Sequence, residues 1–115
     1  LGAPPPASDD SVIRGNPGSP GKTRGVARVV TTIDEADRLG VGEILVTPTT
    51  APPWTPLFGI AAAVVTDTGG ALSHCAVVCR EYGIPGVVGT LVGTARIPDG
   101  QLVEVDGDEG TVRLL

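Results

Sequence analysis

The segment that most constrains the fold is a continuous apolar run, Ala61–Thr66, which leads into a turn and then into a helical pattern. An uninterrupted apolar run of this length is typical of a strand that is buried on both faces. The turn covers Asp67–Gly70, and the best helical pattern of the chain follows over Ser73–Tyr82, with Gly83 at its end. A buried strand that passes through a turn into a helix predicts a mixed α/β domain.

Turns and short strands are expected along the rest of the chain, because 17 glycines and 11 prolines occur among 115 residues. The patterns predict strands at Gly25–Val30, Glu43–Thr47, Val87–Val88, Gln101–Asp106 and Thr111–Leu115, and a short helix over Thr32–Leu39. We expect loops at Asn16–Gly21 and at the Pro-rich Pro48–Pro56, the latter leading into a helical turn around Trp54–Phe58. Residues 1–14 lack periodicity and are expected to form a linker or tail, which leaves one domain over residues 15–115.

The charge balance argues against nucleic-acid and membrane partners. The formal net charge is -5, and the eight Lys and Arg residues form no run. The longest apolar stretch, Ile60–Val65, is too short to span a bilayer. No basic segment followed by an apolar one opens the chain, and the only cysteines lie four residues apart in a helical pattern. We therefore expect a cytoplasmic protein without a structural disulfide.

The only histidine, His74, lies at the start of the predicted helix, where unpaired backbone N–H groups and the helix dipole form an anion site. Gly69 and Gly70 lack Cβ atoms, so their backbone can approach a phosphate closely. Ser73 can cap the helix or donate its hydroxyl to a phosphate oxygen. The dipole disfavours the imidazolium, and a neutral imidazole is the form that attacks phosphorus. From these residues alone, a cap or packing role for His74 remains the competing interpretation.

The segment around His74 closely resembles the signature of the PEP-utilising enzymes. It reads TDTGGALSH over Thr66–His74 and REYGIPGVVG over Arg80–Gly89, and the family pattern is T-D-x-G-G-x-x-S-H-x-A-x-x-x-R followed by G-I-P-x-V-V-G. The family includes phosphoenolpyruvate synthase, pyruvate phosphate dikinase, rifampin phosphotransferase and enzyme I of the sugar phosphotransferase system. The similarity extends to Glu43–Pro48 and Trp54–Phe58 and covers most of the chain. Two departures are Leu72, where the family often has Thr, and cysteines at positions 75 and 79, where Ala is common.

The resemblance implies a swivelling β/β/α domain that carries a phosphoryl group. His74 matches the phosphorylated histidine, and Gly69, Gly70 and Ser73 match the loop beside it. In the family this domain moves between an ATP-grasp domain, which phosphorylates the histidine, and a second domain, which holds the acceptor. ATP and Mg²⁺ are thus expected on partner domains, and no cofactor or metal is expected on this one. The resulting hypothesis is a phosphotransferase domain that is inactive by itself; the alternative is a non-catalytic module whose helix N-terminus binds an anion.

Several other residues have two interpretations. Cys75 and Cys79 are either core residues or, with His74, metal ligands; their spacing, which Val78 and Tyr82 continue, favours the core. Arg80 either holds a surface acid or reaches a partner's phosphate. Asp67 is either a turn residue or a residue that orients a donor. Trp54 and Phe58 either form a docking surface for a neighbouring domain or close the end of the sheet.

Overall fold

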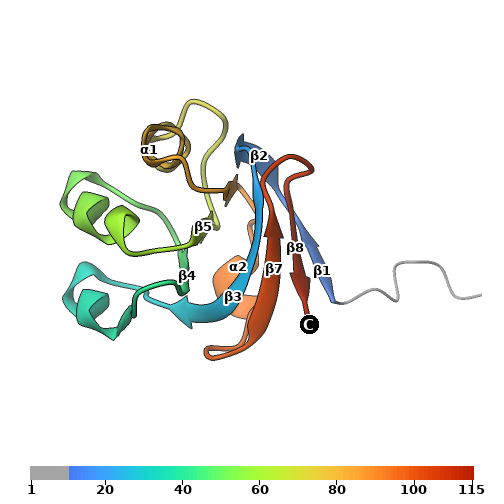
Figure 1. The fold of residues 1–115 in the computed structure, drawn as a ribbon, viewed down its shortest axis with the longest axis horizontal. Helices are drawn as coiled ribbons and strands as arrows, with labels where there is room; N and C mark the ends of the chain where they lie inside the picture. The colour runs from blue at the N-terminus through green and yellow to red at the C-terminus, as the bar shows by residue number, and fades with distance from the viewer. Residues whose placement is uncertain (1–10) are drawn as a thin grey trace, which may run out of the picture.

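The computed structural model describes residues 11–115, which form an α/β domain with an eight-stranded sheet. The strands are β1 (Val12–Arg14), β2 (Asn16–Ser19), β3 (Lys22–Val29), β4 (Ile44–Thr47), β5 (Ala63–Thr66), β6 (Gly86–Val88), β7 (Leu102–Asp106) and β8 (Thr111–Leu114). The helices are α1 (His74–Tyr82), the short α2 (Gly93–Arg96) and the 3-10 helices η2 (Ile33–Arg38) and η3 (Pro52–Gly59). Figure 1 shows α1 and the 3-10 segments on one side of the strands, and β7, β8 and β1 on the other.

The sheet has the strand order β1-β8-β7-β3-β4-β5-β6-β2 and is divided by strand β3. The first part of β3, Lys22–Val26, pairs antiparallel with β7, whereas Ala27–Val29 pairs parallel with β4. Strands β4, β5 and β6 continue the parallel half, and β2 is added antiparallel at its outer edge. A single long strand therefore joins an antiparallel half to a mainly parallel half.

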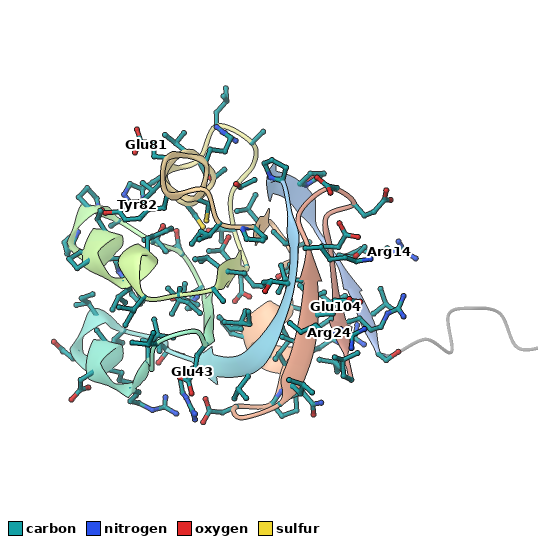
Figure 2. All side chains as sticks on the ribbon, in the orientation of Figure 1. Arg14, Arg24, Glu43, Glu81, Tyr82 and Glu104 are labelled. Carbon is teal, nitrogen blue, oxygen red and sulfur yellow. The ribbon has the colours of Figure 1, made fainter. Side chains whose placement is uncertain are left out.

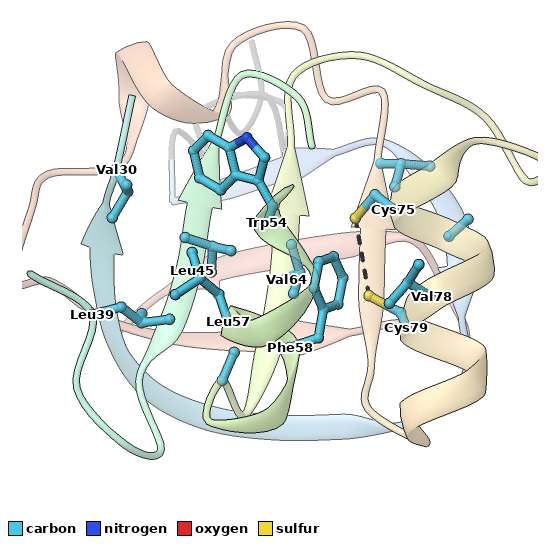
Figure 3. Packing of buried hydrophobic residues seen from close by; sticks show 13 residues of the cluster. Val30, Leu39, Leu45, Trp54, Leu57, Phe58, Val64, Cys75, Val78 and Cys79 are labelled. Atoms are coloured by element: carbon cyan, nitrogen blue, oxygen red, sulfur yellow. Dashed lines mark hydrogen bonds between the residues drawn. The ribbon is translucent and has the colours of Figure 1, made fainter. Parts of the chain in front are cut away.

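Two hydrophobic clusters lie on opposite faces of the parallel strands. Successive side chains of a strand point to opposite faces, so Ile44 and Val46 join one cluster and Leu45 joins the other. The cluster of Ile44 and Val46, which we call the inner cluster, also contains residues of β1, β7 and β8, such as Ile13, Val105 and Val112. It therefore fills the space between the two halves of the sheet. The cluster of Leu45, which we call the outer cluster, is drawn in Figure 3 and packs the strands against α1 and η3. The result is the three-layer β/β/α arrangement that the resemblance implied.

The α/β class and the six strands expected from the sequence are confirmed, and no end of a strand differs from its expected position by more than three residues. Three expectations are corrected. Val12–Arg14, placed in the linker, forms strand β1 on β8, and Asn16–Ser19, placed in a loop, forms β2 on β6. The expected helix at Thr32–Leu39 is a 3-10 helix, and the Thr32 side chain makes no capping bond. The remainder of the expected linker, residues 1–10, lies outside the described residues.

The sequence patterns did not predict β1 and β2, because both are edge strands of only three or four residues and pair with strands that lie far away along the chain. Val12 aligns with Arg113, and Asn16 aligns with Val88. Helix α2 was also not expected, since its four residues contain no apolar repeat. Within residues 11–115, no helix has the length and apolar character needed to cross a membrane.

Candidate functional site

The candidate site lies where the parallel strands β4, β5 and β6 end, since their carboxyl ends meet at one edge of the sheet. Hydrogen bonds join the three loops that follow them. The Thr68 amide donates to the carbonyl of Pro48 (3.2 Å), and the Gly89 amide donates to the carbonyl of Thr68 (3.2 Å). The Leu91 amide donates to the carbonyl of Asp67 (2.8 Å). The loop that leads into α1 is therefore held from both sides.

The turn before α1 requires a glycine at position 69 but not at position 70. Gly69 has a φ of 106°, and a Cβ added there would lie 2.9 Å from the Cβ and Oγ atoms of Ser73. An added Cβ on Gly70 would meet no atom within 4 Å. Ser73 is the N-cap of α1, and its side-chain oxygen accepts a hydrogen bond from the Ala76 amide (3.3 Å). The glycine thus permits the tight approach that sets the start of the helix.

His74 is the first residue of α1, and its half-buried ring is fixed by two contacts. The Nδ1 atom lies 2.9 Å from the hydroxyl oxygen of the buried Thr50. The ring also meets the Phe58 ring edge-on, with 6.2 Å between the centroids and 84° between the planes. No described residue hydrogen-bonds Nε2, so this nitrogen is the one left for chemistry.

Thr50 is a site residue that the sequence analysis missed. It lies 24 residues before His74, in the loop after β4 that was expected only as a Pro-rich connection. When the Thr50 oxygen accepts a hydrogen bond from Nδ1–H, the free lone pair of the neutral imidazole is on Nε2. The only sequence signal for this contact is that Thr50 follows a buried strand adjacent to the one that leads to His74.

Asp67 and Arg80 both stabilise the scaffold of the site. The Asp67 carboxylate accepts hydrogen bonds from the Thr94 amide (2.9 Å) and hydroxyl (2.5 Å), so it ties the loop before α1 to α2. This agrees with the turn interpretation of Asp67. The Arg80 guanidinium donates to the carbonyl of Gly18 in β2 (2.6 Å), so neither of its two expected partners is the one observed.

The aromatic residues of η3 belong to the core. Trp54 is 8% exposed and Phe58 is 1% exposed, so their interpretation as an exposed docking surface is wrong. Phe58 instead links the core to the site through its contact with His74.

Helix α1 packs onto the sheet through its small residues. Cys75, Val78 and Cys79 are buried, as their spacing predicted, but Tyr82 is 46% exposed and does not complete the stripe. The two sulfur atoms lie 4.0 Å apart, and the hydrogen bond with Cys75 together with burial raises the pKa of the Cys79 thiol above its usual range. The two cysteines are therefore core residues.

Relatives of this chain are longer proteins of which it matches one part. It is 59% identical over 113 residues to chondramide synthase cmdD of Chondromyces crocatus, covering 98% of this chain and 3% of the synthase. It is 47% identical over 102 residues to the phosphoenolpyruvate synthase of Aeropyrum pernix, covering 88% of this chain and 12% of that enzyme. The chain therefore spans a small fraction of the length of the curated relatives that it matches.

The fold is also similar to a solved structure. The solution structure of enzyme I superposes with a TM-score of 0.60 and 32% sequence identity, over 69% of this chain and 33% of that one. A sequence model described as the mobile domain of PEP-utilising enzymes matches residues 39–110, which include both flanking loops and the whole of α1. The chain belongs to the PEP-utilising enzyme family and matches its mobile domain.

Proposed function

We propose that the domain carries a phosphoryl group on Nε2 of His74 and relays it between two other domains. The observation that supports this most strongly is the state of the ring: Thr50 holds Nδ1, and Nε2 has no described partner. His74 is also the first residue of α1, where the backbone N–H groups of the first turn favour a negative group. The phosphoryl group would thus be attached beside the positive end of the helix.

The transfer step follows from this geometry. The lone pair of Nε2 attacks the phosphorus atom of the donor, an N–P bond forms, and the bond from phosphorus to the leaving oxygen breaks with its electron pair on that oxygen. The imidazole that results carries a proton on Nδ1 and gains positive character. The Thr50 oxygen, 2.9 Å from Nδ1, accepts a hydrogen bond from this N–H group and stabilises the phosphorylated ring, while the proton stays on Nδ1.

The donor and the acceptor are proposed to bind on other domains. The sequence resemblance implies an ATP-grasp domain that binds ATP and Mg²⁺, and a second domain that binds the acceptor. The phosphoenolpyruvate synthase of Aeropyrum pernix has room for both, because this chain covers 12% of its length. A relay that takes its phosphoryl group from ATP belongs in the cytoplasm. Within this proposal, the domain supplies the covalent nucleophile and binds no cofactor of its own.

The test is phosphorylation of His74 in the full-length gene product. The protein is incubated with ATP and Mg²⁺, and acid-labile, base-stable phosphate is measured by intact mass. We expect a label that is absent from His74→Ala and from His74→Gln, the latter retaining a polar side chain of similar size. A wild-type protein that binds ATP and Mg²⁺ but stays unlabelled would contradict the relay and favour the anion-binding module.

A further inference from the structure

The Phe58 ring lies between two other rings, one at each end of helix α1. It meets the His74 ring of the first turn edge-on, with 6.2 Å between the centroids. It also meets the Tyr82 ring of the last turn at a tilt of 41°, with 6.1 Å between the centroids. Figure 3 shows Phe58 where η3 faces α1, and Figure 2 shows Tyr82 on the side of α1 that faces η3. We call Tyr82, Phe58 and His74 the aromatic row.

Phe58 is held more firmly than the histidine ring that it touches. Its side chain is 1% exposed and belongs to the outer cluster, whereas His74 is half-buried. Tyr82 is 46% exposed, but its ring lies close to η3, since a Cβ added to Gly59 would be 3.8 Å from the Cε2 atom of Tyr82. The core therefore holds Phe58 from behind and Tyr82 supports it from the side, so that Phe58 forms a fixed wall next to His74.

The hydrogen bond to Thr50 does not by itself define the orientation of the His74 ring. A hydrogen bond tolerates a range of donor angles, so the ring can tilt while Nδ1 stays bonded to the hydroxyl oxygen 2.9 Å away. The side chain resists this tilt little, because the torsion about the Cβ–Cγ bond of histidine has a broad energy profile. The edge-on contact with Phe58 supplies the missing restraint, since aromatic pairs prefer particular interplanar angles. The two contacts together set the direction of the Nε2 lone pair.

We propose that Phe58, supported by Tyr82, is a positioning residue that aims the Nε2 lone pair of His74 at the phosphorus atom of the donor. This rests on the proposed function and adds to it the residue that orients the nucleophile. Transfer requires aligned reacting atoms, so a ring that tilts spends less time in the reactive orientation. Phe58 acts only through the ring that it touches: Thr50 selects the nitrogen that reacts, and Phe58 selects the direction in which that nitrogen points.

The experiment measures how fast phosphoramidate phosphorylates His74 in the full-length gene product. The P–N bond of phosphoramidate breaks, ammonia leaves with the electron pair of that bond, and a new bond forms between phosphorus and Nε2, so no nucleotide site takes part. Phe58→Leu keeps an apolar side chain in the core but removes the ring. We expect its rate constant to fall about twofold to tenfold, the factor that corresponds to one aromatic pair.

Trp54→Leu is the matched control for a loss of core packing. Trp54 is also a buried aromatic residue of η3, and among the described residues its ring has no contact with the ring of His74. Trp54→Leu should lower the melting temperature as Phe58→Leu does, yet keep the wild-type rate constant. At the exposed end of the aromatic row, Tyr82→Leu should also slow the reaction, whereas Tyr82→Phe keeps the ring and should restore the rate.

The outcomes separate this proposal from the proposed function. If the wild-type protein is labelled and Phe58→Leu reacts at the same rate, or if Trp54→Leu slows the reaction equally, the positioning role is refuted and the carrier function stands. Should Phe58→Leu fail to fold, equal rate constants for Tyr82→Leu and Tyr82→Phe would overturn the proposal. If the wild-type protein takes no label from phosphoramidate or from ATP, the proposed function fails, and the positioning role fails with it.

Discussion

Replacing Thr50 with valine tests the role of the hydrogen bond at Nδ1 of His74. Valine has the shape of threonine without its hydroxyl, and Thr50 is 8% exposed, so the substitution fills the same space. Nδ1 of His74 then loses the partner that lies 2.9 Å away. We expect slower phosphorylation of His74, because the Nδ1–H form of the ring is no longer favoured over the form that carries the proton on Nε2.

The magnitude follows from the strength of one hydrogen bond. A typical intramolecular hydrogen bond contributes about 0.5–1.5 kcal/mol. If the bond to Thr50 selects the tautomer and persists in the transition state, its loss raises the barrier by the same amount. Since about 1.4 kcal/mol corresponds to a factor of ten in rate, Thr50→Val should phosphorylate about twofold to tenfold more slowly. Thr50→Ser keeps the hydroxyl and should recover most of the rate.

The assay is single-turnover labelling of His74, together with imidazole ¹⁵N NMR shifts that report which ring nitrogen holds the proton. Thr49→Val is the control, because Thr49 is exposed and its hydroxyl has no described role at the ring. Wild-type labelling by Thr50→Val with the proton still on Nδ1 would refute the idea that Thr50 selects the tautomer. A slow Thr50→Val that Thr50→Ser fails to rescue would instead indicate a packing effect.

Three further predictions follow. Gly69→Ala should destabilise the domain by at least about 1–2 kcal/mol, because residue 69 has a positive φ. Its melting temperature should fall by about 4–8 °C for each kcal/mol lost. Gly70→Ala is the control and should melt like the wild type, because its added Cβ meets no atom within 4 Å; equal melting temperatures of the two variants would contradict this prediction. The hydrogen bond from Arg28 lowers the pKa of Glu43 below its ordinary value of 4.5, so its contribution to stability is present above pH 4.5 and is lost as the pH falls through the lowered pKa. The free energy of unfolding, measured with urea from pH 7 to pH 3, should therefore fall less steeply with pH in Glu43→Gln than in the wild type. The same pH dependence in both proteins would count against the ion pair. Arg80→Gln should reduce stability by about 1 kcal/mol by weakening the bond to β2 without slowing the labelling of His74; slow labelling at unchanged stability would show that Arg80 meets the phosphate.

Local patterns were sufficient for the centre of the domain. The apolar run of β5, the glycine turn and the cap at Ser73 are all determined by neighbouring residues, and the structure has each of them. The position of His74 at the first turn of α1 follows directly from that sequence. Its chemical role stays a prediction.

The contacts that the sequence did not predict all join residues that are far apart in the chain. Thr50 and His74 are 24 positions apart, and Arg80 and Gly18 are 62 positions apart. Such contacts depend on strand order, which periodicity does not determine. Trp54 and Phe58 illustrate the same limit: aromatic residues in a Pro-rich segment are equally compatible with a surface and a core, and only packing against α1 and the outer face of the sheet decided between them.

The height of His74 above the sheet is set by small residues on the buried face of α1. A Cβ added to Gly86 in β6 would lie 2.9 Å from the Cys79 sulfur, and one added to Gly18 in β2 would lie 3.3 Å from the Ala76 Cβ. The helix therefore rests close to both strands, and larger residues at positions 76 or 79 would move it outward. Since the ring of His74 must stay within hydrogen-bond reach of Thr50, such a shift would break the contact that leaves Nε2 free. Close packing beneath the helix is therefore as necessary for the proposed reactivity of His74 as the glycine loop in front of it.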